Sequence, residues 1–265
     1  MNGFSSILIL CLGLVSCGGA TENIASSSAT KSPVINGNGF AVVELFTSEG
    51  CSSCPMAEAL MPKIRDAYGN KVAILEFHVD YWDRNGWKDP YSAKVYSERQ
   101  QNYADHFNRS NPTIYTPQAI VNGKNGINGS VEASLKSLIN TELQQAPSKD
   151  IDLNISNPSK DKISVSYNAM LDNKEVINIA LVQLKPISDI KGGENTGKSV
   201  DHMNVVRMFV SETKDNGVIN MTLPDNLSPR DFLVVAYTQN KTSRYITGVK
   251  LVDIQKQGLV QRLVK

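Results

Sequence analysis

The sequence predicts an α/β domain, with a central mixed sheet and flanking helices, followed by a mostly antiparallel, β-sandwich-like domain. Two observations carry this prediction. Between Phe40 and about Leu143, strand-like segments alternate with helix-like segments, as in sheets whose faces are covered by helices. After Pro147, about seven short strand-like segments follow one another with turn signals and no helical pattern between them. We therefore predict domains over residues 40–147 and 148–265.

The segments of the first half are predicted from hydrophobic periodicity. Apolar runs predict strands at 40–46, 71–79 and 118–121, the last of them ending in an Asn-Gly turn. Helical spacing of apolar residues predicts helices at 57–68, 89–107 and 131–145. Asp89-Pro90 is suited to the start of the second helix.

The segments of the second half are short, rich in β-branched residues and bounded by turn residues. The predicted strands are 151–156, 161–171, 176–185, 204–212, 217–223, 232–239 and 245–254.

The N-terminus predicts export. The apolar run Ile7–Val15 is too short to span a bilayer, which takes about 20 residues, but it fits a signal peptide over residues 1–16. Leu14-Val15-Ser16-Cys17 resembles the bacterial lipoprotein signal, although no Lys or Arg precedes the apolar run. The resemblance implies a lipid on Cys17 and a membrane anchor facing the periplasm or exterior. The alternative is a plain secretory signal and a secreted protein.

Composition narrows the classes of partner. Residues 17–39 are rich in Gly, Ser, Thr, Asn and Ala, which predicts a flexible tether. The 27 Lys and Arg residues nearly balance the 26 Asp and Glu residues. This balance gives no basic field for nucleic acid and no polybasic membrane patch.

Cys51 and Cys54 form a Cys-x-x-Cys motif between a predicted strand and a predicted helix, with Pro55 directly after it. Unpaired N–H groups and the dipole at a helix start stabilise a thiolate, which is the reactive form of cysteine. We expect Cys51 at the exposed end and Cys54 one turn further in. A passive disulfide closing so short a loop removes little chain entropy, so redox activity is favoured over a structural role. A metal clip is the other alternative.

The order strand, Cys-x-x-Cys, helix, strand resembles the thioredoxin fold. Thioredoxin-like proteins place a cis-proline opposite this motif, and Thr116-Pro117 directly precedes the predicted strand at 118–121. The segments "ELFTSEGCSSCPMAE", "HVDYWDRNGWKDPYS", "RQQNYA" and "IYTPQAIVNG" further resemble the secreted thioredoxin-like family catalogued as domain of unknown function 1223. The resemblance implies a thioredoxin-like core and no established activity.

Two polar residues of the predicted strands are candidates for roles beside the cysteines. Glu44 lies within an apolar run, where burial raises a carboxyl pKa, and is a candidate proton acceptor for Cys54. The alternative is a Glu on an exposed strand face. His78 ends the second strand and is a candidate metal ligand with Cys51 and Cys54, or an acid–base group. The alternative is a structural histidine.

Aromatic residues on a polar loop suggest a binding surface. Tyr81 and Trp87, together with Thr116, are candidates for substrate contact, whereas Trp82 is expected to fold inward. 

Residues 192–199, "GGENTGKS", match the phosphate-loop pattern, but a strand-like segment follows them instead of the helix that the pattern needs. We predict no nucleotide and a hairpin loop, with Gly192 and Gly197 at positive φ. His202 and Arg207 follow this loop and are candidates to face the first domain.

These observations favour thiol–disulfide exchange, in which Cys51 forms a mixed disulfide, Cys54 resolves it and Pro117 holds the substrate chain. The expected partners are protein thiols or disulfides and a redox partner, and no organic cofactor is required. The alternatives are a Cu(I)-type binding module at Cys51, Cys54 and His78, and a non-catalytic interaction protein with a structural disulfide.

Overall fold

The computed structural model describes residues 38–255. Its first half contains β1 (Ala41–Thr47), α1 (Cys54–Glu58), α2 (Met61–Tyr68), β2 (Val72–His78), α3 (Lys94–Phe107), β3 (Gln118–Val121), β4 (Asn125–Asn128) and α4 (Glu132–Glu142). Its second half contains β5 (Ile151–Ser159), β6 (Lys162–Ala169), β7 (Glu175–Gln183), β8 (Ile187–Asp189), β9 (Ser199–Asp201), β10 (Val205–Glu212), β11 (Asn216–Thr222), β12 (Phe232–Asn240) and β13 (Ile246–Asp253). The predicted signal segment, Cys17 and nearly all of the predicted tether lie outside the described residues.

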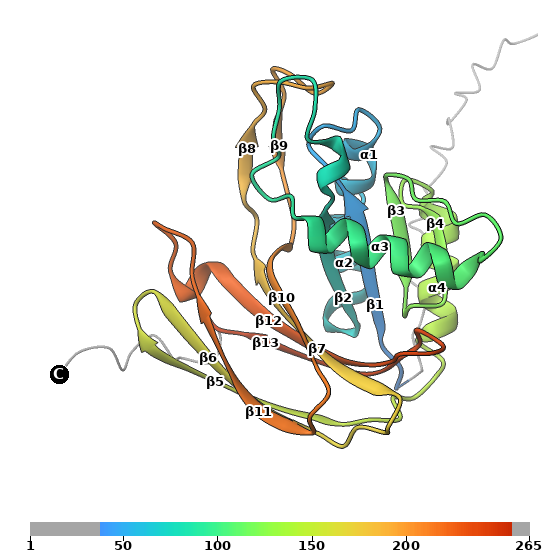
Figure 1. The fold of residues 1–265 in the computed structure, drawn as a ribbon, viewed down its shortest axis with the longest axis vertical. Coiled ribbons are helices and arrows are strands. Elements are labelled where there is room, and N and C mark those ends of the chain that lie inside the picture. Colours follow the sequence, from blue (N-terminus) through green and yellow to red (C-terminus); the bar gives the residue numbers. More distant parts are fainter. Residues whose placement is uncertain (1–37, 256–265) are drawn as a thin grey trace, which may run out of the picture. The chain divides into compact units, whose positions relative to one another are not determined.

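The largest sheet is mixed and has the strand order β13-β12-β7-β10-β2-β1-β3-β4 (Figure 1). β1 runs parallel to β2 and antiparallel to β3, and β3 forms an antiparallel pair with β4. The two faces of β1 are covered by different helices. Val42 and Phe46 pack in a cluster with Tyr96 and Tyr103 of α3. The cluster on the opposite face combines residues of β1, α1, α2 and α4, namely Val43, Leu45, Ala57, Met61, Ile64, Leu135 and Ile139.

Two predicted helices differ from the observed ones. The helix predicted at 57–68 is divided, because α1 ends at Glu58 and α2 begins at Met61 with a proline in its first turn. The helix predicted from residue 89 begins only at Lys94. Asp89 does not cap it, because its carboxylate is bound to the His78 ring and the Glu49 N–H.

The predicted change from mixed α/β to antiparallel strands is observed, but the second half does not form a separate sheet system. β10 pairs with β2 in parallel, with Val205 opposite Glu76, and pairs with β7 in antiparallel. Strands from both halves therefore belong to one sheet, and the described chain forms one compact unit. Residue 148 marks a change of topology within this unit instead of a boundary between two sheets.

The remaining strands extend the second half. A three-stranded sheet, β11-β6-β5, packs on β7, β12 and β13 through a shared apolar cluster that includes Val165, Ile179 and Val234. β8 and β9 form a separate hairpin beside the end of the large sheet at which α1 begins (Figure 1). This hairpin corresponds to the loop predicted around residues 192–199, with β9 following it as a strand.

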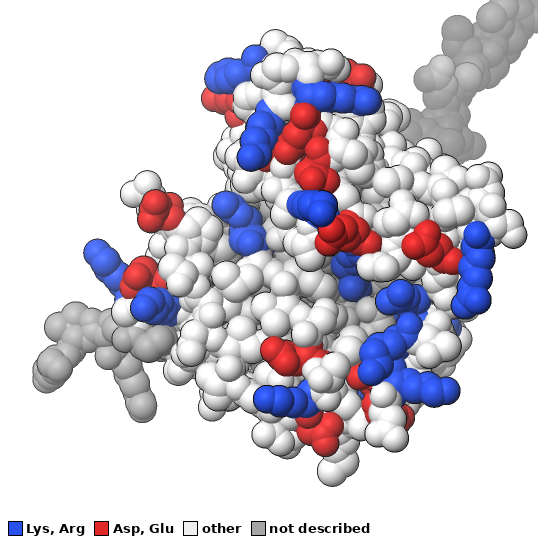
Figure 2. Space-filling view, in the orientation of Figure 1, with Lys and Arg blue, Asp and Glu red and all other residues white. Residues whose placement is uncertain are grey.

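Charged side chains of both signs are interleaved on the face shown in Figure 2, where neither sign forms a continuous patch. Such a face has no single-sign field that would attract a polyanion. Within residues 38–255, none of the helices has the length and apolar character needed to cross a bilayer.

Candidate functional site

The two cysteines of the motif form a disulfide. Cys51 lies in the loop after β1 and Cys54 begins α1, and their Cα atoms are 5.4 Å apart. Cys51 was expected to be exposed, but it is 1% exposed and Cys54 is 0% exposed. The pair is therefore covered.

The cover is the loop between β8 and β9, residues 190–198, which we call the hairpin loop. The Asn195 side-chain amide donates hydrogen bonds of 2.8 Å to the carbonyl oxygens of Glu49 and Cys51. The Ser52 N–H donates to Glu194 at 3.2 Å. Asn195 is itself 1% exposed, so these contacts fix the hairpin loop against the cysteine loop.

Glycines let the hairpin loop approach its neighbours. Gly193 and Gly197 have φ of 72° and 84°. The predicted positive φ is confirmed at Gly197, whereas the one predicted at Gly192 occurs one residue later, at Gly193. Gly192 has a different reason to be glycine, because a Cβ there would lie 2.7 Å from the Gly86 carbonyl oxygen.

Pro117 lies beside the cysteine loop. Gln118 of β3 pairs with Phe46 of β1, so Pro117 adjoins the end of β1 from which the chain continues to Cys51. The Thr116–Pro117 peptide bond is cis, as the resemblance implied. Trp82 joins the two segments: its indole N–H donates to Thr116 Oγ1 at 2.7 Å, and its backbone packs on Gly50.

The aromatic candidates have partners within the protein. The Trp87 indole N–H donates to Glu49 at 2.9 Å, and its Cβ packs against the glycines of the hairpin loop. The Tyr81 hydroxyl donates to Gln100 at 3.1 Å, and burial raises the pKa of Tyr81 to about 12. Both side chains are half-buried, so in this structure they hold loops in place.

Glu44 is not beside Cys54. It lies on the β1 face covered by α3, whereas α1 packs on the opposite face with Leu45. Its carboxylate accepts hydrogen bonds from Arg99 at 2.8 Å and from the hydroxyls of Tyr103 and Tyr237. The sequence placed Glu44 correctly in a buried strand, but the direction of its side chain excludes a direct contact with the disulfide.

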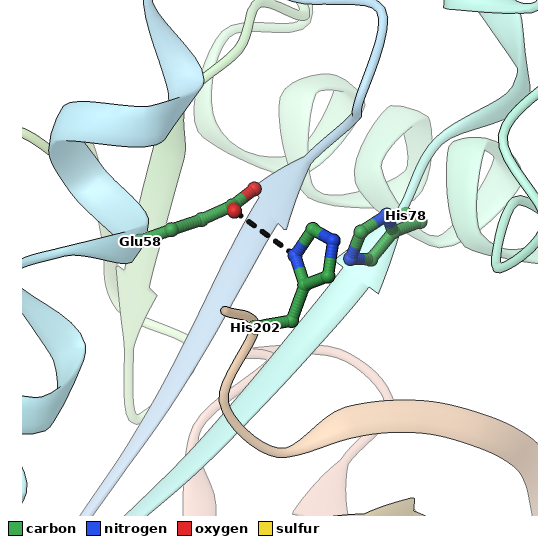
Figure 3. Close-up of side chains that lie close together, drawn as sticks. All are labelled: Glu58, His78 and His202. Atoms are coloured by element: carbon green, nitrogen blue, oxygen red, sulfur yellow. Dashed lines mark ion pairs between the residues drawn. The ribbon is translucent and has the colours of Figure 1, made fainter. Parts of the chain in front are cut away.

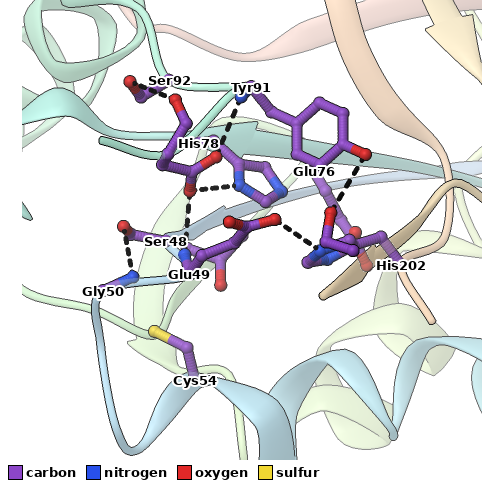
Figure 4. A network of polar contacts seen from close by, with 12 residues as sticks. Ser48, Glu49, Gly50, Cys54, Glu76, His78, Tyr91, Ser92 and His202 are labelled. Atoms are coloured by element: carbon purple, nitrogen blue, oxygen red, sulfur yellow. Dashed lines mark hydrogen bonds and ion pairs between the residues drawn. The ribbon is translucent and has the colours of Figure 1, made fainter. Parts of the chain in front are cut away.

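Near Cys54, on the α1 side of the sheet, the structure assembles a buried polar cluster that joins both halves of the chain (Figure 4). We call it the His–Glu cluster, and it consists of Glu49, Glu58, Glu76, His78, Asp89 and His202. Glu58 follows Cys54 by one helical turn, which places both on the buried face of α1. His202 comes from the segment between β9 and β10, so the expectation that it faces the first half is met.

Each histidine of this cluster is bound to a carboxylate. His78 Nδ1 lies 2.7 Å from Asp89 Oδ2, and His202 Nε2 lies 3.2 Å from Glu49 Oε1. His202 Nδ1 lies 3.0 Å from Glu58 Oε2, with Figure 3 showing the ring nitrogen directed toward the carboxylate. The two rings are 5.0 Å apart between centroids.

The carboxylates change the protonation of the cluster. Burial lowers the pKa of His202, but its polar contacts with Glu49 and Glu58 and the charges of Glu58 and Glu76 outweigh burial and raise that pKa to about 11. Burial raises the pKa of Glu76 well above its usual value, and the neighbouring Glu58 charge adds to this shift. For Glu58, the contacts with His202 outweigh burial, and its pKa is lowered.

The metal group proposed for Cys51, Cys54 and His78 is not assembled. Among the residues that the structure describes, the group that could hold a metal ion with His78 contains Glu58 and His202 instead of the cysteines, and its three ligand atoms all lie within 4.8 Å of one another. Glu58 was not singled out from the sequence. The available signal was its position four residues after Cys54 on the apolar face of a helix.

Comparisons with known proteins add a family and a fold. A family model described as "Protein of unknown function (DUF1223)" matches residues 42–239. A crystal structure of a protein from Agrobacterium tumefaciens is similar, with a TM-score of 0.58 and 25% sequence identity, over 80% of this chain and 93% of that one. No curated protein matches the chain.

Proposed function

The chain belongs to the DUF1223 family of proteins of unknown function, and from its own site we propose that it carries out thiol–disulfide exchange through Cys51 and Cys54. The single observation that carries the proposal is the Cys51–Cys54 disulfide at the junction of β1 and α1, beside the Pro117 loop. This order of elements supports a thioredoxin-like origin for the first half.

The proposed reaction begins when a substrate thiolate attacks Cys51 Sγ. The bond between the two cysteines breaks, a mixed disulfide forms, and Cys54 leaves as a thiolate. A second substrate thiolate then attacks the mixed disulfide and releases Cys51. The substrate gains a disulfide, the pair gains two electrons and two protons, and a partner disulfide reoxidises it. The reverse sequence reduces a substrate disulfide.

The substrate class in this proposal is a protein thiol or disulfide presented as an extended chain along the Thr116–Pro117 segment. Because Cys51 is 1% exposed, exchange requires the hairpin loop to move away from it. Export, with anchoring through Cys17, is part of the proposal, since extracytoplasmic compartments maintain disulfides.

The burial of both cysteines favours a second candidate, a structural disulfide in an interaction protein. A redox titration separates the two. The full chain is equilibrated in glutathione and dithiothreitol buffers, and free thiols are trapped and counted by mass. We expect a reversible two-electron transition at roughly −120 to −270 mV, the range of exchange proteins. 

A midpoint below about −300 mV would identify a structural disulfide and end the exchange proposal. Cys54→Ser is the matched variant, because it leaves Cys51 able to form a mixed disulfide that nothing resolves. We expect it to accumulate this adduct with a substrate protein, and Cys51→Ser to form much less.

A further inference from the structure

Several buried side-chain atoms of the His–Glu cluster make no hydrogen bond. Among the described residues, buried side-chain atoms that lack a hydrogen-bond partner include His78 Nε2, His202 Nδ1, Glu58 Oε2 and Glu76 Oε1. All four belong to this cluster, and their side chains are buried. Leaving a buried polar atom without a partner costs about 1–3 kcal/mol. Several such atoms close together indicate that an ion or another ligand binds to this cluster.

The free atoms are the ones that metal ions use. A histidine that binds a metal through one nitrogen usually has its other nitrogen on a carboxylate or carbonyl. His78 shows this arrangement, with Nδ1 on Asp89 and Nε2 free. In His202 the two nitrogens are exchanged: Nε2 is on Glu49, and Nδ1 has no aligned hydrogen bond but lies 3.0 Å from Glu58 Oε2. The two carboxylates thus fix both rings and leave one nitrogen of each available to an ion.

From this geometry we propose that Glu58, His78 and His202 bind a divalent transition-metal ion, with zinc as the ion that the donor set fits most directly. The three ligand atoms lie within 4.8 Å of one another. A tetrahedral zinc ion with bonds of about 2.0–2.1 Å holds its ligands about 3.3 Å apart, so a small closure of the side chains completes the site. Two histidines and a glutamate form a known zinc ligand set that leaves the fourth position open.

Charge supports a cation at this point. Four carboxyl groups, those of Glu49, Glu58, Glu76 and Asp89, are buried with only two imidazoles. A divalent ion compensates more of this charge than a proton does. 

The simpler alternative to a metal ion is a second proton on the His202 ring, because a charged ring would form ion pairs with both Glu49 and Glu58. It leaves two observations unexplained. His78 Nε2 still lacks a partner, and Glu58 and His202 approach to 3.0 Å without the alignment of a hydrogen bond. A shared ion accounts for both, because the ligands of one metal lie close together and His78 Nε2 would be bound to the same ion.

The proposed site is separate from the cysteines and does not depend on thiol–disulfide exchange. It contains no sulfur ligand, which favours zinc over the Cu(I) expected for a cysteine site. 

The test begins with the full chain, stripped by a chelator and titrated with zinc chloride alone. Native mass spectrometry counts the bound ions, and thermal unfolding follows their effect. We expect one zinc ion per chain and a melting temperature that rises with zinc concentration. A stripped chain that takes up no stoichiometric zinc would overturn the proposal.

Variants locate the ion. His78→Ala and His202→Ala are expected to lose it. Asp89→Asn and Glu58→Gln change fewer atoms and cover the case in which a histidine variant fails to fold. For Asp89→Asn we expect an affinity about 10–100-fold lower, as for other residues that orient a ligand.

The matched control is His106→Ala, which removes the third histidine of the chain, on α3, and should leave the stoichiometry at one. The double variant Cys51→Ser/Cys54→Ser should also bind one zinc ion. Loss of zinc from either of these proteins, or its retention by both His78→Ala and His202→Ala, would place the metal elsewhere and refute the assignment.

Discussion

Replacing Glu44 by glutamine is expected to lower the free energy of unfolding by about 3–5 kcal/mol, because it leaves the Arg99 guanidinium buried without its counter-charge. Glu44 is 0% exposed and the Arg99 side chain is 12% exposed. Burial lowers the pKa of Arg99, but Glu44 and two tyrosines outweigh it and raise that pKa, so the guanidinium stays charged. Urea unfolding followed by circular dichroism measures the change.

The control for this prediction is Glu98→Gln, on the same helix as Arg99. Glu98 pairs with Lys94 and is 56% exposed, so its loss should change the free energy of unfolding by less than about 1 kcal/mol. The double variant Glu44→Gln/Arg99→Met removes both charges and should recover part of the lost stability. A Glu44→Gln protein within about 1 kcal/mol of wild type would show that the pair contributes little.

Glu44→Gln also separates a structural role of Glu44 from a role in disulfide exchange. Because Glu44 lies on the sheet face away from α1, we expect Glu44→Gln to leave the pH dependence of disulfide exchange unchanged under conditions in which it is folded. A shifted pH profile would restore the proton-acceptor role suggested by the sequence.

Replacing Asn195 by alanine is expected to speed reduction of the Cys51–Cys54 disulfide by about ten-fold or more. The substitution removes both hydrogen bonds that the Asn195 amide donates to the cysteine loop. The Cys51 carbonyl oxygen keeps the Cys54 N–H as a donor, but the Glu49 carbonyl oxygen loses the donor that Asn195 supplied. Leaving a buried carbonyl oxygen unpaired costs about 1–3 kcal/mol, and each 1.36 kcal/mol corresponds to a factor of about ten. The substitution destabilises the position in which the hairpin loop contacts the cysteine loop. A position in which the hairpin loop has moved away from Cys51 therefore becomes more populated.

The measurement is the rate of reduction by a phosphine, followed by alkylation of free thiols and mass analysis. Thr196→Ala is the matched control, since this exposed hydroxyl donates only within the hairpin loop, to the Gly193 carbonyl oxygen. Glu44→Gln supplies a second comparison. If it accelerates reduction as much as Asn195→Ala does, reduction proceeds through global unfolding and the hairpin loop does not control access.

The strands nearest the site were predictable because their signals are local. The apolar runs at β1 and β2 and the Thr116–Pro117 pair before β3 are each visible within a few residues. The start of α3 was not predictable in the same way. Asp89 is a good cap in isolation, but it is bound to His78 and to the Glu49 backbone, and the helix starts five residues later, at Lys94.

The composition of the His–Glu cluster could not be read from the sequence. Glu58 and His202 are 144 residues apart, and their approach depends on the pairing of β10 with β2, which no local pattern specifies. The orientation of Glu44 has a similar cause. Alternation places Glu44 with Phe46 on one face of β1, but only the fold determines that α1 covers the other face.

The pairing of β10 with β2 also determines what each half of the chain would lose if it occurred without the other. A half that ended near residue 147 would expose the edge of β2 and lack His202, which pairs with Glu58 of α1. A half that began there would keep the pairing of β10 with β7 but lose the contact of Val205 with β2. Each half on its own would therefore lose part of this junction. The family match from residue 42 to residue 239, across both halves, is what a unit inherited whole would leave.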